Sequence, residues 1–291
     1  MASRARGEAL PRQCEICGAD AGSIDLLRGG RLDRCGRCGH LRRSLIDAPA
    51  KHRDAAYGGD PSLDKVRTHL TYGWLRAVGR PSSVFEIGYG SGALLRRFHD
   101  AGAAISGVDP DQLAVDVDPV VAENGQLWSC AVEEVPDGAV SADLVVGVHV
   151  IEHVVDPVTT MRKAASLLHD GGSVVLLTPA GDSWGLRAYG SAWWMLEDPT
   201  HVRFFTEASL RHLAEDAGLV DVRVDRLVLD SISVDVASLV RAWRPPGPEG
   251  ALASRAVRGA ALATAPLVAT MRLVAPQTRP TLRLTARCGP R

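Results

Sequence analysis

Four of the six cysteines form two CxxC pairs near the N-terminus. Zn²⁺ prefers a tetrahedral shell of such thiolates, and a shell filled by four cysteines leaves no position for water or substrate. The spacing therefore predicts a structural zinc site, with a pair of disulfides as the alternative. The predicted ligands are Cys14, Cys17, Cys35 and Cys38.

A glycine-rich loop, GYGSG, follows a short apolar run at residues 83–87. Glycines let the backbone approach a ligand closely at the start of the following helix. The loop alone is ambiguous, because Gly88, Gly90 and Ala93 also satisfy the GxGxxA pattern of dinucleotide-binding folds, with Asp109 for the ribose. The candidate cofactor-binding residues here are Glu86, Gly88, Tyr89, Gly90, Gly92, Asp109 and Pro110.

The HxxEH sequence of His149, Glu152 and His153 matches a zinc motif of peptidases when both histidines lie one turn apart on a helix. Residues 143–150, however, form a β-branched run typical of a strand, and Pro157 leaves no room for a long helix that would carry both histidines. We therefore expect no catalytic zinc here.

A segment rich in aromatic and polar residues, 178–206, separates a predicted strand from a predicted helix. Loops of this length at the ligand end of a sheet usually build binding sites. Imidazole accepts protons near neutral pH, so we predict His201 as the general base and His153 as the second candidate, a loop-bracing histidine being the alternative. The helpers expected beside them are Glu197 and Tyr189. Trp193 and Trp194 are expected either to stack on an acceptor or to anchor the loop.

Apolar runs and helical patterns alternate through the middle of the chain, which predicts an α/β fold: a Rossmann-like, doubly wound, mostly parallel seven-stranded sheet. Ligands of such sheets bind beyond the carboxyl ends of the strands. Strands are expected at 83–87, 103–108, 126–130, 142–148, 173–177, 220–229 and 281–286, and helices at 62–78, 156–171 and 206–218.

In this order the motifs resemble the class I S-adenosylmethionine-dependent methyltransferases. The (E/D)xGxGxG loop of that family is matched from Glu86 to Gly92, its ribose-binding acid by Asp109, and its "HVLEHxxDP" segment by HVIEHVVDP from His149 to Pro157. The resemblance implies S-adenosylmethionine as cofactor, with Glu133 of the VEEVP segment near the adenine and His149 near the methionine part.

The segment 178–206 resembles bacterial methyltransferases of polysaccharide and secondary-metabolite pathways. It also resembles zinc-ribbon sugar C-methyltransferases, whose "EHFSYFS" is echoed by THVRFFT with His201 at the histidine. The resemblance implies a small-molecule acceptor, a sugar or a natural-product or cell-envelope intermediate, methylated on oxygen or carbon. An RNA methyltransferase and a non-catalytic cofactor- or partner-binding module of the same fold are the alternatives.

The chain divides into a zinc ribbon (12–45), a cofactor-binding domain (60–230) and a C-terminal helical extension with a closing strand (231–291). The extension is basic, with nine arginines and one glutamate over residues 241–291, and its Ala-rich helical pattern at 251–274 is interrupted by Pro266. We expect this helix either to cover the acceptor pocket or to lie on an anionic membrane, which would suit a lipid-linked saccharide.

Charge and hydropathy restrict the class of protein. Lys and Arg number 33 against 34 Asp and Glu, which argues against a nucleic-acid-coating protein. The longest uncharged stretch near the C-terminus, 259–271, is shorter than a transmembrane helix, and residues 1–12 lack a signal-peptide core. We therefore expect a cytoplasmic enzyme with no transmembrane segment.

Overall fold

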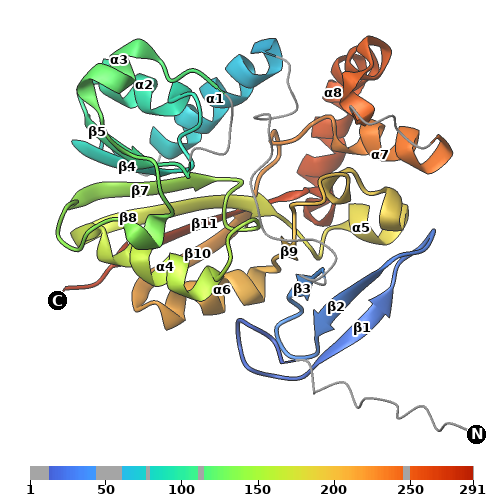
Figure 1. The fold of residues 1–291 in the computed structure, drawn as a ribbon. Coiled ribbons are helices and arrows are strands. Elements are labelled where there is room, and N and C mark those ends of the chain that lie inside the picture. The colour runs from blue at the N-terminus through green and yellow to red at the C-terminus, as the bar shows by residue number, and fades with distance from the viewer. Residues whose placement is uncertain (1–12, 44–60, 77–78, 111–114, 245–249, 291) are drawn as a thin grey trace, which may run out of the picture.

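The computed structural model describes residues 13–43, 61–76, 79–110, 115–244 and 250–290. The outer ends of the predicted zinc ribbon (12 and 44–45) and the first residue of the predicted cofactor domain (60) lie outside these ranges. In Figure 1 a central sheet carries helices on both faces, and the N-terminal ribbon lies beside one end of the sheet.

Seven strands form the central sheet in the order β10-β11-β8-β7-β4-β5-β6. The pairs from β8 to β6 are parallel, whereas β11 is antiparallel to both β8 and β10. This is the mostly parallel, doubly wound sheet that the alternating pattern predicted. The strands are β4 (Ser83–Ile87), β5 (Ala104–Val108), β6 (Gln126–Trp128), β7 (Ala142–Val148), β8 (Leu168–Pro179), β10 (Leu219–Arg226) and β11 (Thr281–Cys288).

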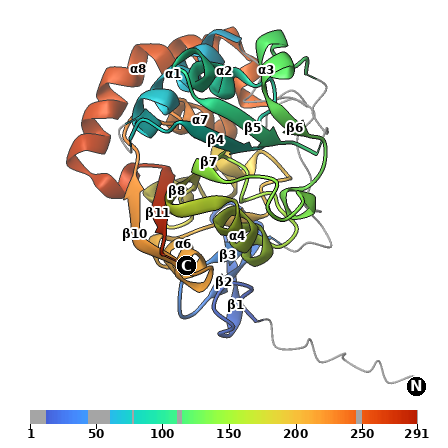
Figure 2. The ribbon, with the colours of Figure 1, turned by 90° about the vertical axis from the view of Figure 1, so that its left-hand side faces the viewer.

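Helices cover the sheet on both sides, which explains why its inner strands are apolar at successive positions. In Figures 1 and 2, α1 (Pro61–Arg76), α2 (Ala93–Asp100) and α3 (Pro119–Asn124) lie over one face. The other face carries α4 (Pro157–Ser166) and α6 (Glu207–Asp216). Short 3₁₀ turns lie at Val132–Glu134, Gly190–Ala192, Trp194–Leu196, Ala251–Ala253 and Pro276–Thr278.

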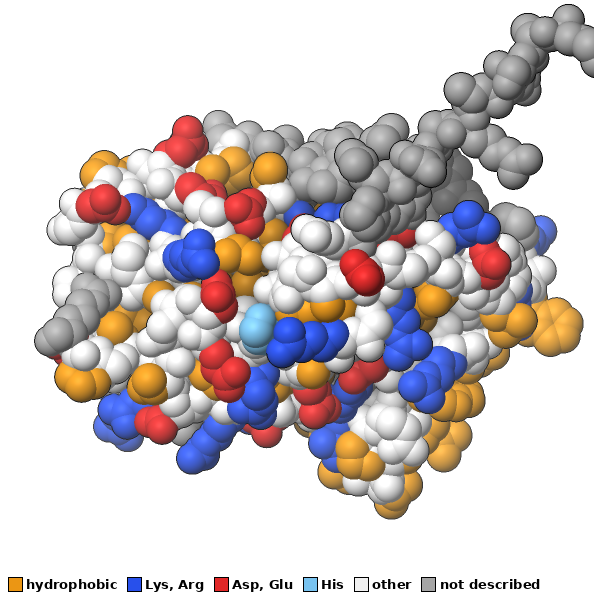
Figure 3. All heavy atoms as spheres, turned by 90° about the horizontal axis from the view of Figure 1, so that it is seen from below, with side chains coloured by type: hydrophobic (Ala, Val, Ile, Leu, Met, Phe, Trp, Pro, Cys, Tyr) orange, Lys and Arg blue, Asp and Glu red, His pale blue; other side chains and the backbone are white. Residues whose placement is uncertain are grey.

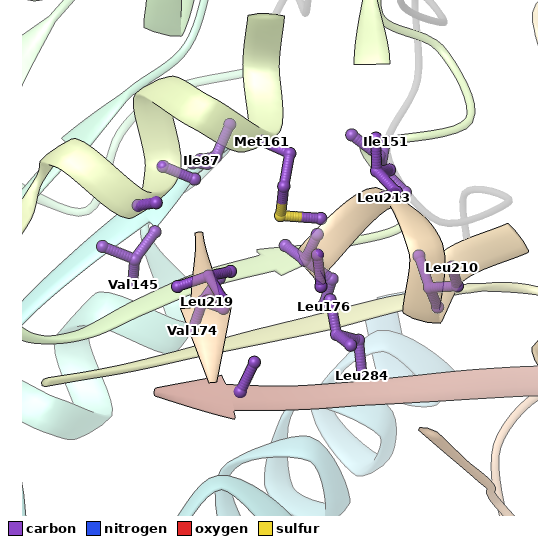
Figure 4. Close-up of a cluster of buried hydrophobic side chains, with 14 of the residues drawn as sticks. Ile87, Val145, Ile151, Met161, Val174, Leu176, Leu210, Leu213, Leu219 and Leu284 are labelled. Atoms are coloured by element: carbon purple, nitrogen blue, oxygen red, sulfur yellow. The ribbon is translucent and has the colours of Figure 1, made fainter. Parts of the chain in front are cut away.

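Two apolar cores result from this arrangement. On β7 and β8, Val145 and Val174 face the core beneath α4 and α6, while Val146 and Val175 face the core beneath α1 and α2. Figure 4 shows the first core, in which Met161 of α4 points toward the sheet. Both cores hold the carboxyl ends of β4, β5 and β7 in fixed register, and those ends carry the candidate site.

A second, four-stranded sheet joins the ribbon to the central domain. Its order is β1 (Ala21–Asp25), β2 (Arg31–Cys35), β3 (Leu41–Arg42) and β9 (Arg203–Phe204). The last strand comes from the segment 178–206, which also contains α5 (Trp184–Tyr189). We call residues 180–206 the acceptor loop.

The C-terminal extension contributes α7 (Val234–Trp243) and α8 (Arg255–Val274) before the chain returns as β11. Helix α8 continues through Pro266, so the interruption expected at that residue is wrong. Among the described helices, α8 is the one that is long and apolar enough to cross a membrane by length and composition. The core helix of a soluble protein also passes that test. What the apolar composition of α8 means therefore depends on which face of the helix is buried.

Candidate active site

The glycine loop lies between β4 and α2 in backbone conformations that favour glycine. Gly88, Gly90 and Gly92 have φ values of 74°, 50° and 74°. A Cβ atom on Gly88 would lie 2.7 Å from Val150 Cγ2, so the loop packs directly on the segment that follows β7. The Gly90 N–H donates to Asp109 Oδ2 at 3.0 Å, which places the acid at the end of β5 against the loop.

Glu86, the acid of the loop motif, is 2% exposed at the end of β4. Burial raises its pKa well above the usual value, and the neighbouring Asp109 raises it further. Its Oε2 atom has no hydrogen-bond partner among the described residues. A buried carboxyl oxygen without a partner is costly, so this atom fits a polar ligand group that completes the site.

His149 directly follows β7 with a φ of 55°, a conformation uncommon for a side chain other than glycine. Its Nδ1 lies 3.1 Å from Glu152 Oε1 and its Nε2 lies 3.4 Å from Asp230 Oδ2. Burial and Arg67 oppose protonation, but the two carboxylates outweigh them and raise the pKa of His149. Both ring nitrogens face carboxylates, so the surroundings favour the protonated ring, and both nitrogens are already engaged.

Glu152 lies fully buried among the histidines. Thr178, on β8, donates to Glu152 Oε2 at 3.0 Å. Burial opposes ionisation, but the hydrogen bond from His149 and the charges of the surrounding histidines lower the pKa of Glu152 to about 2. The carboxylate is therefore a fixed negative charge at the carboxyl end of the sheet.

His201 sits on the acceptor loop and faces this carboxylate. Its Nδ1 donates to the Met195 carbonyl at 2.8 Å, so in the neutral ring the lone pair is on Nε2. Nε2 lies 4.0 Å from Glu152 Oε1 and 3.9 Å from Asp198 Oδ2. Burial lowers the pKa of His201 against the opposing pull of the two carboxylates, which keeps the imidazole neutral near pH 7.

His153 lies beside His201, with ring centroids 4.7 Å apart. Thr200 Oγ1 donates to Asp198 Oδ1 at 2.6 Å and accepts from His153 Nδ1 at 3.0 Å. The structure thus brings together the two histidines that the sequence predicted as base candidates, on two different elements.

Glu152, His153 and His201 could also hold a metal ion, because one ligand atom of each lies within 4.8 Å of the others. Two imidazoles and one carboxylate are a common set for divalent transition metals. The set differs from the HxxEH pattern, since His201 takes the place of His149. Coordination and proton abstraction would use the same lone pair of His201, so the two roles exclude each other.

The remaining predicted site residues lie in other surroundings. Glu197 binds Arg241 at 3.2 Å and the Ala251 N–H at 2.9 Å, so its carboxylate ties the acceptor loop to the C-terminal extension. Tyr189 packs edge-on against Trp184, and burial raises the pKa of its phenol. The contacts of both side chains are therefore with the acceptor loop and the C-terminal extension, and their helper roles stay predictions.

Three of the predicted cofactor-binding residues lie around the carboxyl ends of the parallel strands, beside the glycine loop or farther out. Glu133 accepts a hydrogen bond from Thr160 of α4, so its carboxylate is engaged by the helix. Tyr89 packs close to Gly107 of β5, where a Cβ atom would approach its ring to 3.1 Å. Pro110 follows β5 and precedes residues 111–114, which are outside the described chain.

Of the two adjacent tryptophans, Trp193 is completely buried and packs on Phe204 with ring centroids 5.6 Å apart. It is therefore an anchor of the acceptor loop, one of the two roles expected for it. Trp194 instead lines a pocket beside α8.

The four ribbon cysteines converge as predicted for a metal shell. The Sγ atoms of Cys14 and Cys38 lie 3.6 Å apart, and that of Cys17 lies 3.5 Å from those of both Cys35 and Cys38. A tetrahedral zinc site with Zn–S bonds of about 2.3 Å requires sulfur separations close to these. The described cysteines are free thiols, so the alternative of two disulfides does not hold here.

The ribbon is bound tightly to the acceptor loop. Arg203 of β9 is fully buried and pairs with Glu15 of the ribbon at 2.8 Å, while its other donors bind the carbonyls of Val154 and Val155. Thr206 Oγ1 donates to the Cys38 carbonyl at 2.6 Å. The ribbon therefore positions the loop that carries His201.

Asp230 is the main site residue that the sequence analysis missed. Its side chain is fully buried, accepts hydrogen bonds from Thr281 and Ser231, and lies 3.7 Å from Arg67. Burial opposes its ionisation, but Arg67 and His149 outweigh burial and lower its pKa far below the usual value. Its position directly after the predicted strand 220–229 was the available signal.

A family model described as a methyltransferase domain matches residues 63–224, more than half of the chain. The chain belongs to this family. The match confirms the methyltransferase expected from the motifs and decides the ambiguity of the glycine loop against a dinucleotide oxidoreductase.

Curated relatives of this methyltransferase include ubiquinone biosynthesis O-methyltransferases. That of Rhodopseudomonas palustris (strain BisB18) is 33% identical over 98 residues, which cover 33% of this chain and 39% of the relative. That of strain HaA2 is 27% identical over 159 residues, which cover 52% of this chain and 63% of the relative. The chain thus matches less than two thirds of the length of either relative.

Among solved structures, phosphoethanolamine N-methyltransferase 2 of Haemonchus contortus, in complex with S-adenosyl-L-methionine, is similar with a TM-score of 0.53. The similarity covers 82% of this chain and 55% of that chain at 17% identity. At this identity the similarity concerns the fold alone, and it agrees with the Rossmann-like sheet.

Proposed function

We propose that this methyltransferase transfers a methyl group from S-adenosylmethionine to an oxygen of a small-molecule acceptor, with His201 as the general base. The observation that carries the proposal is the orientation of His201, whose Nδ1 is bound to the Met195 carbonyl while Nε2 lies 4.0 Å from Glu152 Oε1, on the segment that follows β7. The names of the curated relatives support oxygen as the methylated atom.

The cofactor would bind across the glycine loop, with Asp109 positioned for ribose hydroxyls and the unpartnered Oε2 of Glu86 for a further polar group. When bound, S-adenosylmethionine supplies a methyl group on a positively charged sulfonium. The protein's contribution is to align acceptor and methyl group, because orientation accounts for much of the acceleration of such displacements.

In the proposed reaction the acceptor hydroxyl gives its proton to His201 Nε2. The neutral imidazole is the base, and the charge that it gains is stabilised by Glu152 Oε1 at 4.0 Å and Asp198 Oδ2 at 3.9 Å. The base lies on the acceptor loop, and the cofactor would lie at the carboxyl ends of the strands. The acceptor and the cofactor would therefore meet at the same edge of the sheet.

His149 and Asp230 serve as positioning residues in this proposal. The imidazolium of His149 links Glu152 to Asp230, which fixes the carboxylate beside His201. A metal ion held by Glu152, His153 and His201 is the second candidate arrangement, favoured by the proximity of their ligand atoms. Calorimetric titration of the zinc-loaded protein with Mg²⁺ and Mn²⁺, with Glu152→Gln as control, separates it from the base mechanism.

The zinc ribbon, the acceptor class and the location also belong to the proposal. The four thiolates would hold a structural Zn²⁺, since they leave no open coordination position. A sugar or a natural-product or cell-envelope intermediate is the proposed acceptor, handled in the cytoplasm. Figure 3 shows interspersed acidic and basic side chains on one face of the molecule, which gives no support there to the alternative of an RNA acceptor.

The test compares His201→Ala with a matched control, His212→Ala on α6. Methyl transfer from radiolabelled S-adenosylmethionine is screened over phenols and nucleotide sugars, and the cofactor dissociation constant is measured by calorimetry. We expect His201→Ala to lower kcat by about 10²–10⁴-fold with cofactor affinity unchanged, and His212→Ala to leave both unchanged. Full turnover of His201→Ala overturns the base, and absence of cofactor binding favours the non-catalytic module.

A further inference from the structure

Helix α8 has the reverse of the polarity expected for a helix on a protein surface. Its exposed side chains include Leu262, Leu267, Leu273 and Val274, which are 61–78% exposed. By contrast, Arg272 is completely buried, and Arg258 bonds inward to the carbonyls of Leu252 and Ala253. Beyond Arg255, the first residue of the helix, none of the exposed residues of α8 is charged. We call residues 256, 259, 260, 262, 263, 266, 267, 270, 273 and 274 the α8 face.

The buried arginine fixes α8 in this orientation. Arg272 donates to the carbonyl of Asp230 at 2.7 Å and to the carboxylate of Asp235, on α7, at 3.0 Å. Breaking a buried pair of this kind is costly, so α8 cannot rotate its apolar side inward. The same contacts oppose its release from the domain to cross a membrane, although its length and composition would permit this.

The α8 face borders an apolar pocket between α1 and α8. The pocket has a volume of about 140 Å³, and its walls include Val66, Leu70, Trp74 and Ala265. Leu262 is both part of the pocket wall and 61% exposed, so the mouth of the pocket opens at the α8 face. Figure 2 shows α8 on the outside of the molecule next to α1.

The pocket also has polar residues in its wall, and these border the candidate active site. Arg67 and the buried Asp230 are among them, and Asp230 is the carboxylate that binds His149. An elongated acceptor with an apolar chain would therefore extend its chain toward α8, and its polar end would lie near the residues that surround His201.

We propose that the α8 face lies in the interfacial layer of an anionic lipid bilayer, from which the pocket receives the apolar chain of the methyl acceptor. The second part rests on the proposed function, whereas bilayer binding does not. Exposed basic side chains next to the helix support an anionic bilayer as the occupant: Arg255 at the start of α8 and Arg244 directly after α7 are both exposed, within a segment, 241–291, that carries nine basic residues and one acidic residue. Helices that lie on membranes combine an apolar face with such a basic surrounding.

The same charge argues against a second copy of this chain on the α8 face. Two copies packed through α8 would bring two strongly basic extensions together, and like charges repel across such a contact. An anionic lipid surface instead attracts the extension and covers the leucines.

The test is co-sedimentation of the full zinc-loaded chain with phosphatidylcholine vesicles, with and without phosphatidylglycerol, at low and high salt. The loss variant is Leu267→Glu with Leu273→Glu. The control is Val155→Glu with Val220→Glu, which adds the same charge at exposed apolar positions outside α8 and outside the pocket lining. Calorimetry with S-adenosylmethionine checks that each variant retains its fold.

We expect the native chain and the control to bind anionic vesicles, more weakly at high salt. The α8 variant should lose binding by about tenfold or more, because two leucines no longer enter the apolar layer. Equal binding of both variants, or no binding to any vesicle, overturns the proposal. A dimer of the native chain in light scattering that the α8 variant abolishes assigns the face to a second copy instead. Vesicle binding without methyl transfer overturns the proposed function alone.

Discussion

Arg203 and Glu15 lie 188 residues apart in the sequence and form a two-point ion pair, with Nε to Oε1 at 2.8 Å and Nη2 to Oε2 at 3.0 Å. The arginine belongs to β9 of the acceptor loop and the glutamate to the ribbon. His40 also contacts Glu15, at 3.0 Å. Burial opposes ionisation of Glu15, but these partners outweigh it and lower its pKa to about 2. The ribbon is thus an electrostatic and β-sheet partner of the loop that carries His201.

Substituting Glu15→Gln should therefore disturb both stability and catalysis. The change leaves the Arg203 guanidinium buried without its counter-charge, and we expect a loss of about 2–4 kcal/mol in the free energy of unfolding. We also expect kcat to fall while the cofactor dissociation constant stays the same, because the glycine loop lies on other elements. Denaturant unfolding, calorimetry and turnover measure the three quantities.

Asp25→Asn is the matched control for this substitution, since Asp25 also pairs with an arginine of the ribbon, Arg31, but at the surface. Exposed pairs contribute little, so its effect on stability should stay within about 0.5 kcal/mol. Equal effects of the two substitutions would show that the ribbon does not act through Arg203.

Removing the metal should affect the acceptor loop more than the cofactor site. We expect about one zinc per chain, and chelation should expose the ribbon to proteolysis because a segment of this size has no sufficient core of its own. Since Thr206 binds the Cys38 carbonyl and β9 pairs with β3, turnover should fall with the metal while cofactor binding persists. Unchanged turnover in the zinc-free protein would contradict a positioning role of the ribbon.

Gly88→Ala tests the cofactor loop. The new Cβ atom meets Val150 Cγ2 at 2.7 Å at a φ of 74°, so we expect the cofactor dissociation constant to rise about tenfold or more, measured by calorimetry. Gly138→Ala is the control, because Gly138 has a φ of 75° and its new Cβ atom would have no neighbouring atom within 4 Å. It should carry the same backbone strain and leave cofactor affinity unchanged. Equal loss of affinity in both variants would attribute the effect to strain alone.

The cofactor end of the fold was predictable because its signals are local. The apolar run 83–87, the glycines after it and Asp109 lie within one strand–helix–strand unit, so their spacing determines their geometry. The fold class and the family could be predicted because several such local motifs follow one another along the chain in the order typical of the family.

The acceptor side was less predictable because it depends on contacts between distant residues. Asp230 meets His149 across 81 residues, and its position after a predicted strand, although a signal for a site residue, does not indicate which residue it contacts. Arg203 looks like a surface residue in the sequence but is fully buried, since its partner is on the ribbon. The inward orientation of Arg272 likewise depends on Asp235 of α7, and no helical periodicity would reveal it.

The pH dependence of turnover tests the protonation state of His201. The proposed base must be neutral, and burial lowers its pKa below the usual 6.5. The rate of methyl transfer should therefore be at its maximum above pH 6.5, and it should fall only as the pH decreases through the lowered pKa of His201. We expect the acidic limb of log(kcat/KM) for a fixed acceptor to have an apparent pKa below 6.5, and Asp198→Asn should move that limb to still lower pH because it removes a carboxylate 3.9 Å from Nε2. A limb above 6.5, or one that Asp198→Asn leaves in place, would exclude His201 as the group that titrates.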